Sequence, residues 1–325
     1  MTYPRAIDIS AGNALIVTDL HGNGQVYNHI RDTFLKLYQA GKVNQLIICG
    51  DLIHSTGHEA EDASLPMLLD VMHLQQQLGR DTVIMLMGNH EMPHVYSVGL
   101  SKGQTIYTPR FERTLAQLDE NPNASYTRAD VMAFIKSLPF VVRTKAGVLI
   151  THAGATPAIR SIADAEQLLN FDHDQLIQQA TDWMQAYELD ALKHHKQYIQ
   201  QVHEMLAVDS VNDPRFLDML RGQLLSANSG QFEFLWDVLF TTNEKETSLQ
   251  AYKRILQANL KALSIDAPSA QTVLVAGHIG VNGGHQIVAQ HQLRLASHAH
   301  AYPKDAGQVL ILNCETPVLK ASDLV

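Results

Sequence analysis

Five short segments of the sequence join a run of apolar residues to an abrupt polar end that contains glycine. They read ALIVTDLHGNG, QLIICGDLIH, TVIMLMGNHE, VLITHAG and TVLVAGHIG. The polar ends carry residue types that bind metal ions, namely Asp19, His21, Asp51, Asn89, His90, His152 and His278. Carboxylate and amide oxygens mixed with imidazoles suit manganese, iron or zinc, and they differ from the donors of a thiolate zinc finger or a calcium loop. The five ends therefore predict a metal site built from distant parts of the chain.

Each motif taken alone also fits a structural role. An acid such as Asp51, after a buried strand and a glycine, is often a turn or helix-cap residue, and His152 or His278 could be a buried histidine with satisfied hydrogen bonds. The GNHE segment is more specific, because it supplies a neutral ligand, a possible acid and a partner, Glu91, that could orient His90 or a loop. We expect a functional site because all five motifs occur, each at the end of a predicted strand.

The elements that must position these residues follow from hydrophobic spacing. The apolar, β-branched runs before the five polar ends are typical of buried strands. Between the first three runs, residues 26–40 and 65–78 have helical spacing, and each segment is followed by a glycine. The first third is therefore predicted to be βαβαβ with parallel strands, whose carboxyl ends meet at one rim of the sheet. Farther on, residues 140–154 predict a hairpin, and residues 283–297 and 306–313 predict antiparallel strands.

A long segment in the second half of the chain contains no convincing strand. Helical spacing occurs there at residues 176–187 and again at residues 195–206. Residues 160–268 hold 9 basic and 16 acidic residues, so most of the net negative charge of the chain lies in this segment. We predict a mostly helical insertion at about residues 160–268 within a single domain of residues 1–325, because no repeat or low-complexity linker divides the chain.

Length and composition restrict the class of protein. The chain has 325 residues, of which 46% are hydrophobic and 18% charged, as in a globular protein with a large core. Its net charge of −9 gives no general attraction for nucleic acid or an anionic membrane, so an anionic substrate would need a local positive centre such as a bound metal. Cys49 and Cys314 lie in apolar runs and cannot form a disulfide framework, which predicts a reducing compartment. Since no leader-like or membrane-spanning apolar stretch occurs, the sequence predicts a soluble, cytoplasmic protein.

The motifs DLHG, GDL, GNHE, HAGATP and AGH resemble those of the calcineurin-like metallophosphoesterases. Within that superfamily, the GNHE and HAG forms are similar to the branch of phosphoprotein phosphatases and dinucleoside tetraphosphatases. The resemblance runs from Val17 to about Asn313 and is weakest in the helical insertion. It implies an α/β fold, a sandwich of two mixed β-sheets flanked by helices, and the activity of a metal-dependent phosphoesterase.

The resemblance also implies two metal ions and a role for each site residue. The ligands of the first ion would be Asp19, His21 and Asp51. The ligands of the second ion would be Asp51, which bridges the pair, with Asn89, His152 and His278. His90 resembles the general acid that protonates the leaving group, and Asn89 and His90 would contact the substrate.

The chemistry of such a pair of ions limits the expected reactions. Two divalent or trivalent ions about 3.5 to 4 Å apart acidify a bridging water and hold phosphate oxygens, so a hydroxide attacks phosphorus near neutral pH. We expect the substrate to be a phosphomonoester, either a phosphorylated small molecule or a phosphoprotein. A phosphodiesterase or nucleotide pyrophosphohydrolase with the same metals is the alternative enzyme, whereas the acidic insertion disfavours nucleic acid. A catalytically inactive scaffold is the alternative of another class, although every ligand type is retained.

Two positions after the bridging carboxylate depart from the phosphoprotein phosphatase pattern. His54 and Ser55 stand where that group has an Asp that orients the catalytic His and an Arg that clamps the phosphate. The sequence leaves open whether Lys102, Arg110 or Arg113 replaces the clamp or whether the metal ions hold the phosphate alone.

The fifth motif departs as well, because Gly280 stands where many members of the superfamily have a second metal-binding His. His285, His298 or His300 could supply the missing ligand. His298 and His300 alternate at the end of a predicted strand, and we expect both to lie in a solvated loop.

Overall fold

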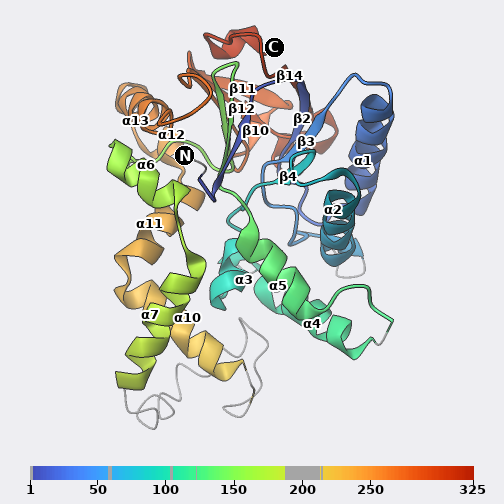
Figure 1. The fold of residues 1–325 in the computed structure, drawn as a ribbon, viewed down its shortest axis with the longest axis vertical. Coiled ribbons are helices and arrows are strands. Elements are labelled where there is room, and N and C mark those ends of the chain that lie inside the picture. Colours follow the sequence, from blue (N-terminus) through green and yellow to red (C-terminus); the bar gives the residue numbers. More distant parts are fainter. Residues whose placement is uncertain (1–2, 58–60, 103–104, 122, 187–212, 214) are drawn as a thin grey trace.

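The computed structural model describes residues 3–57, 61–102, 105–121, 123–186, 213 and 215–325. In this part of the chain the two main sheets lie together at one end of the molecule, and several helices extend away from them at the other end (Figure 1). None of the described helices is long and apolar enough to cross a membrane.

The first sheet has four strands in the order β14-β2-β3-β4. They are β2 (Asn13–Val17), β3 (Gln45–Ile48), β4 (Val83–Met85) and β14 (Leu310–Asn313). The parallel strands β2, β3 and β4 are joined by α1 (Gly24–Gln39) and α2 (Ser64–Leu78). β14 pairs antiparallel with β2. The predicted βαβαβ unit is confirmed, and it places the loops after three strands at one edge of the sheet.

The second sheet has six strands in the order β1-β7-β8-β9-β12-β11. They are β1 (Ala6–Ile9), β7 (Val141–Thr144), β8 (Val148–Thr151), β9 (Val273–Ala276), β11 (His285–Ala289) and β12 (Gln292–Leu295). The predicted hairpin is the antiparallel pair β7 and β8, and β11 pairs antiparallel with β12. β8, β9 and β12 are parallel. Both sheets are therefore mixed, as predicted.

The two sheets pack face to face around an apolar core. Ala14 and Ile16 of β2 lie in this core with Ile150 of β8. Leu15 and Val17, the alternate residues of β2, belong instead to the cluster that contains apolar residues of α1 and α2. Because side chains alternate across a strand, one sheet buries one face against the other sheet and the opposite face against helices. The structure thus confirms the predicted sandwich flanked by helices.

Short helices and a hairpin connect β4 to β7 across the rim of the first sheet. They are α3 (Met92–Tyr96), β5 (Ser101–Lys102), β6 (Thr105–Ile106), α4 (Thr108–Glu120) and α5 (Arg128–Ser137). Thr127 caps α5 by accepting a hydrogen bond from the Asp130 N–H, while the Asp130 carboxylate accepts from the Thr127 N–H. Both α3 and α4 pack against α5, so the side chains of these helices meet beneath the rim.

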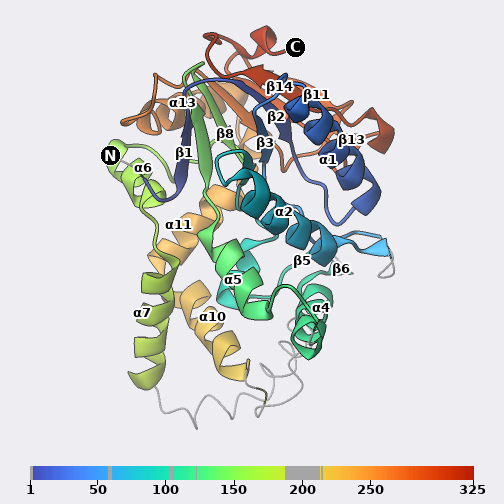
Figure 2. The same cartoon turned by 45° about the vertical axis from the view of Figure 1, so that its right-hand side comes forward.

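The segment between β8 and β9 is helical, and it contains no strand among the residues described between 161 and 268. Its helices are α6 (Ile162–Leu169), α7 (His173–Ala186), α10 (Phe216–Asn228), α11 (Gly230–Leu239), α12 (Asn243–Glu246) and α13 (Leu249–Ala262). α7 and α10 pack side by side and extend away from the sheets (Figure 2). The helical spacing expected at residues 195–206 lies outside the described residues.

Small elements complete the C-terminal part of the chain. They are β10 (Val281–Asn282), β13 (Ala301–Tyr302) and the 3₁₀ turns η2 (Lys304–Ala306) and η3 (Ala321–Asp323). β10 and β13 are parallel, with Val281 opposite Ala301. Cys49 and Cys314 follow β3 and β14, and both are buried free thiols.

Candidate metal centre

The structure brings all six expected metal ligands together. Three of the loops follow the parallel strands of the first sheet and two follow β8 and β9, which are parallel neighbours in the second. Asp19, His21, Asp51, Asn89 and His152 are buried, and His278 is partly buried. The sandwich therefore gathers at one edge side chains that are scattered over the sequence.

The first group of ligand atoms belongs to Asp19, His21, Asp51 and His300, and these atoms lie within 4.8 Å of one another. His21 Nε2 lies 3.5 Å from Asp51 Oδ2, and His300 Nε2 lies 3.6 Å from Asp19 Oδ1. The other ring nitrogen of His21, Nδ1, faces the backbone carbonyl of His54 at 3.3 Å. His21 Nε2 is buried and has no hydrogen-bond partner among the described residues, as expected of a nitrogen that ligates a metal.

The second group consists of Asp51, His152 and His278, whose ligand atoms also lie within 4.8 Å of one another. Asn89 Oδ1 lies 2.7 Å from His152 Nε2 and 2.9 Å from His278 Nδ1. His152 Nδ1 donates to the carbonyl of Cys49 at 2.8 Å, which turns Nε2 toward the group. Asp51 belongs to both groups, with Oδ2 on the side of His21 and Oδ1 3.5 Å from His152 Nε2.

The charges of these groups are suited to cations. Burial lowers the pKa of His21 and of His152 to about 4, although the Asp19 carboxylate opposes the shift in each case. Both imidazoles are therefore neutral at pH 7, which is the form that ligates metals. Burial raises the pKa of Asp51, and the neighbouring carboxylates of Glu91 and Asp19 raise it further. Neutral imidazoles and crowded carboxylates form a donor set that fits metal ions.

The backbone is strained where it presents these side chains. Among the described residues, seven non-glycine residues have positive φ, and five of them lie in this site: Asp19 (52°), His21 (44°), Asp51 (52°), His54 (70°) and His278 (68°). Left-handed conformations cost about 1 to 3 kcal/mol at such residues, although Asp and His tolerate them better than most side chains. Strain concentrated in this way is typical of a functional site.

His90 lies between the metal groups and a row of buried side chains. Its backbone N–H donates to Asp51 Oδ1 at 2.9 Å, and its Nε2 lies 3.9 Å from Asp51 Oδ2. Its other ring nitrogen, Nδ1, lies 3.0 Å from Nδ1 of His54. The His90 ring therefore presents Nε2 to the metal groups.

Residues 13–221 match the family model of the calcineurin-like phosphoesterases. The chain belongs to this family. It is thus a metal-dependent phosphoesterase, and the family uses divalent metals. No curated protein matches the sequence.

The chain is similar to several solved structures at low sequence identity. A protein serine/threonine phosphatase from Saccharomyces cerevisiae with similarity to human phosphatase PP5 has a TM-score of 0.52 and 14% identity, with 98% of this chain and 80% of that chain covered. A metallophosphoesterase from Sphaerobacter thermophilus has a TM-score of 0.34 and 11% identity, covering 94% of this chain and 85% of that chain. A putative diadenosine tetraphosphatase matches with a TM-score of 0.29 and 21% identity over 48% of this chain and 57% of that chain. The yeast phosphatase supports the shared fold.

The expectation that His300 lies solvated in a loop was wrong for its side chain. His300 does lie in a turn, but its side chain is only 16% exposed and belongs to the first ligand group. The parallel register of β10 and β13 places it beside Gly280, whose added Cβ would meet the ring of Tyr302 at 2.6 Å. The imidazole of His300, in the turn that precedes β13, thus joins the first ligand group, to which Gly280 contributes no side chain. His298 instead pairs with the Asn23 amide at 2.9 Å, and His285 is bonded to Gln308 at 2.6 Å.

Glu91 holds the two loops that carry Asp51 and His90. Its carboxylate accepts hydrogen bonds from the backbone N–H groups of Asp51 (2.9 Å), Leu52 (2.9 Å) and Gly88 (3.0 Å). The sequence left open whether Glu91 orients His90 or holds a loop. The structure shows that Glu91 holds loops.

The three basic side chains that could replace the phosphate clamp lie in different surroundings. The Arg110 guanidinium contacts the carbonyls of Ser55 (3.4 Å) and Gly57 (3.1 Å) and lies 3.6 Å from Asp62 Oδ2. Arg113 is exposed on α4. Burial raises the pKa of Asp51, whereas the charge of Lys102 acts to lower it, so the field of Lys102 reaches the metal groups.

Sequence reasoning missed the groups that support the site from behind. His94 and Glu112 continue the row of hydrogen-bonded side chains that begins at His90 and His54.

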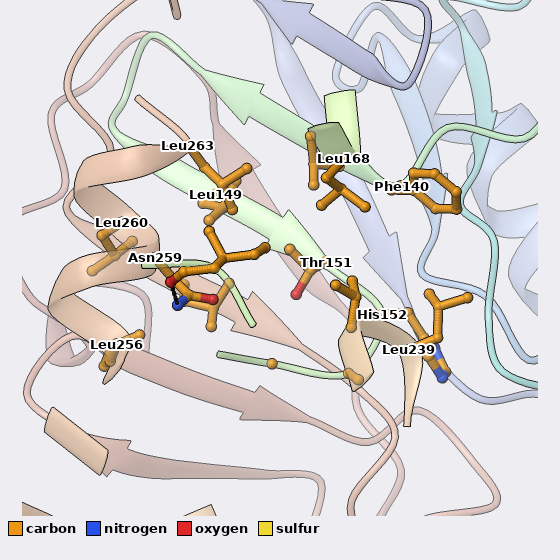
Figure 3. Close-up of a pocket in the computed structure, with 16 residues that line it drawn as sticks. Phe140, Leu149, Thr151, His152, Leu168, Leu239, Leu256, Asn259, Leu260 and Leu263 are labelled. Carbon is orange, nitrogen blue, oxygen red and sulfur yellow. Dashed lines mark hydrogen bonds between the residues drawn. The ribbon is translucent and has the colours of Figure 1, made fainter. Parts of the chain in front are cut away.

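Behind His152, apolar side chains of β7, β8, α6, α11 and α13 line a cavity of about 20 Å³ (Figure 3). A cavity of that volume holds about one water, so it is a packing feature and not a substrate pocket. Helical or strand spacing gives no signal for either feature.

Proposed function

We propose that this chain hydrolyses phosphomonoesters at a pair of metal ions. One ion would be held by Asp19, His21, Asp51 and His300, and the other by Asp51, Asn89, His152 and His278. The observation that supports the proposal is that two largely buried ligand groups share one carboxylate, Asp51. Bound ions of manganese, iron or zinc would supply Lewis acidity that activates water and neutralises the charge of the phosphoryl group.

The residues of the chain have separate roles in this proposal. Asp51 has one oxygen on the side of each ligand group and would be shared by the two ions. Asn89 and His90 contact the phosphate, and His90 is the general acid. When the bond between phosphorus and the leaving oxygen breaks, that oxygen takes the proton from Nε2 of His90. The exposed ammonium of Lys102 attracts the anionic substrate, since its field reaches Asp51.

The proposed substrate is a phosphorylated small molecule or a phosphoprotein. The 9 basic and 16 acidic residues of the insertion disfavour nucleic acid, because a polyanion is repelled by an acidic surface. We also propose a reducing, cytoplasmic setting, which the two buried free cysteines support. A phosphodiesterase or nucleotide pyrophosphohydrolase with the same ions is the second candidate enzyme.

Turnover of p-nitrophenyl phosphate and of bis-p-nitrophenyl phosphate in added manganese tests the proposal. We expect the monoester to be hydrolysed faster, and we expect Asp51→Asn to abolish both turnover and the second equivalent of bound metal, because the bridge is lost. Metal content is measured by elemental analysis of the same samples, and thermal unfolding shows whether the variant is folded.

Three outcomes separate the candidates. A strong preference for the diester would replace the phosphomonoesterase with the phosphodiesterase. Less than one metal per chain, together with an Asp51→Asn variant that changes neither stability nor phosphate release, would favour an inactive scaffold. A panel of phosphopeptides and phosphorylated metabolites then identifies the substrate class of an active monoesterase.

A further inference from the structure

One lysine of the helical insertion lies at the edge of the metal centre. Lys245 belongs to α12, and its Nζ donates to the backbone carbonyl of Gly280 at 3.4 Å. Gly280 comes two residues after His278 of the second ligand group. The next residue, Val281, donates its N–H at 2.9 Å to the carbonyl of His300, which belongs to the first ligand group. The ammonium of Lys245 therefore lies beside a loop that is connected to both groups.

Buried contacts with the ligand loops fix the position of α12. Glu244, the residue before Lys245, is paired with the guanidinium of Arg294, and both side chains are almost fully buried. Arg294 in turn donates to the carbonyls of Ala153 and Gly277, next to the ligands His152 and His278. This end of the insertion is thus tied to the metal centre, whereas α7 and α10 extend away from the sheets (Figure 1).

The ammonium of Lys245 is exposed and is not neutralised by a carboxylate in the described part of the chain. Of the two adjacent acids, Glu244 is paired with Arg294, and Glu246 accepts a hydrogen bond from the Thr242 hydroxyl. The contact of 3.4 Å with Gly280 is long for a hydrogen bond, which is usually 2.7 to 3.2 Å. Lys245 can therefore exchange this carbonyl for a better acceptor.

The charge of Lys245 also reaches the metal centre. Burial lowers the pKa of His300, and the charges of Lys102 and Lys245 lower it further. The carboxylate of Asp19 opposes this shift. Lys102 lies on β5, so exposed lysines from two separate segments act on the same imidazole. Positive charge at this edge attracts an anionic substrate.

We infer that Lys245 binds a second anionic group of the substrate, a carboxylate that is separate from the phosphoryl group. The inference rests on the proposed function, and it narrows the substrate class to phosphomonoesters that carry a carboxylate. Lys245 lies outside both ligand groups, so it would contact a part of the substrate that the metal ions do not hold. It also gives the insertion a role in specificity, because α12 supplies the ammonium.

The acidic surroundings favour a carboxylate over a polyanion at this position. The insertion holds 9 basic and 16 acidic residues, so a highly charged ligand is repelled by most of its surface. Lys245 offers one compact positive charge with three donors, which is enough for one carboxylate.

Substrate pairs that differ in a single charge test the inference. N-acetylphosphoserine and its carboxamide differ in the carboxylate nearest to the ester. Blocked phosphoserine peptides with Glu or Gln, one or two residues after the phosphoserine, differ farther from it. We expect the manganese-loaded protein to have a KM that is about two- to fivefold lower for the charged member of at least one pair, which is the effect of an exposed ion pair. The pair that responds shows whether a small molecule or a peptide carries the carboxylate.

Variants of Lys245 assign the preference to this side chain. Lys245→Gln should bring the KM ratio of the responding pair to about 1, Lys245→Arg should retain the ratio, and Lys245→Glu should invert it. Added sodium chloride should reduce the wild-type ratio, because salt screens exposed charges. Lys253→Gln is the matched control, since it removes an exposed ammonium of α13 in the same insertion. It should keep the wild-type ratio.

The outcomes separate this inference from the proposed function. If wild type hydrolyses the esters without a lower KM for the charged member of any pair, or if Lys245→Gln keeps the wild-type ratio, Lys245 does not bind the substrate although the phosphatase proposal stands. A Lys253→Gln variant that loses the ratio as fully as Lys245→Gln would also overturn the inference, because the charge of the whole insertion would then be responsible. If wild type hydrolyses none of the esters with metal bound, the proposed function itself fails.

Discussion

At the scale of single residues, the site gathers negative charge in a buried space. The carboxylates of Asp19, Asp51 and Glu91 are all at most 1% exposed, and burial and their mutual repulsion raise the pKa of Asp51. The surrounding imidazoles of His21 and His152 are neutral because burial lowers their pKa to about 4. Cations that bind between these groups would remove the repulsion and stabilise the folded chain by mass action.

His300→Ala tests whether the turn after β12 supplies a metal ligand. We expect the variant to bind the first ion roughly 10- to 100-fold more weakly, because one imidazole of that group is lost. The second ion, held by the other group, should remain. Titration of apo protein with manganese, followed by calorimetry, measures both sites.

His298→Ala is the matched control for His300→Ala. It changes the alternate histidine of the same turn, which pairs with Asn23 and lies outside both ligand groups. Equal manganese affinities in wild type and His300→Ala would exclude His300 as a ligand.

At the scale of elements, buried charged side chains hold the ligand loops in pairs. Glu91 joins the loops after β3 and β4 through backbone N–H groups. Arg294 of β12 does the same for the loops after β8 and β9, because one of its nitrogens, Nη1, donates to the carbonyls of both Ala153 and Gly277. Glu244 at α12 pairs with the Arg294 guanidinium. The separation of His152 and His278 is therefore set by a residue of a third strand.

Arg294→Lys tests this role. A lysine ammonium cannot reach both carbonyls and Glu244 with the planar fork of a guanidinium, so we expect a loss of about 1 to 3 kcal/mol in the free energy of unfolding. We also expect weaker metal binding, because the loops of His152 and His278 are no longer tied together. Denaturant unfolding and manganese titration measure the two effects.

Arg143→Lys is the matched control for Arg294→Lys. Arg143 is equally buried on β7 and pairs with Asp8 (2.7 Å) and with the carbonyl of Ile265 (2.6 Å), away from the ligand loops. It should lower stability by a similar amount and leave metal affinity unchanged. If both variants change metal affinity alike, the effect belongs to general stability and not to the loops.

At the scale of the whole molecule, the helical insertion shares one apolar cluster with α1, α2 and the helix-covered face of the first sheet. One cluster of apolar residues includes Leu15 of β2, Phe34 of α1, Leu176 of α7 and Leu256 of α13. We therefore propose that residues 1–325 form a single domain, because a shared core couples the parts during unfolding. His173, the first residue of α7, lies at this junction, and its Nδ1 is hydrogen-bonded to the Tyr96 hydroxyl at 2.5 Å.

His173 should make the folded chain sensitive to acid. Burial, with the positive charges of Arg5 and Lys136, holds the pKa of His173 well below its usual 6.5. Below pH 6.5 the unfolded chain therefore binds a proton at this position that the folded chain does not bind. Stability falls as the pH decreases, by up to about 1.4 kcal/mol per pH unit for this group. Denaturant unfolding at pH 7 and pH 5 measures the slope.

His173→Asn should reduce that slope. The Asn side chain retains an acceptor for the Tyr96 hydroxyl but does not titrate in this range. His73→Asn, at an exposed position of α2, is the control. Identical pH slopes in wild type and His173→Asn would show that His173 does not contribute to the acid sensitivity.

The sequence by itself determined the ligand-bearing strand ends and the order of the first elements. Asp19, His21, Asp51, Asn89 and His152 each follow an apolar run, and an apolar run that ends in polar residues marks a buried strand and its exit. Parallel strands joined by helices must present their carboxyl ends on one edge, so convergence could be inferred before any coordinates. These features are local, since each depends on residues within one short segment.

Only the tertiary structure decided which side chains complete and support the site. His300 joins the first ligand group because β13 pairs with β10 in a particular register. The spacing of residues along the sequence does not predict that pairing. The approach of Glu112 on α4 to His94 on α3, and of His94 to His54, depends on how separate helices pack. The distance that Arg294 spans between two loops depends on the order of three strands. Such contacts join segments that are far apart in sequence, so they exist only once the whole chain is packed.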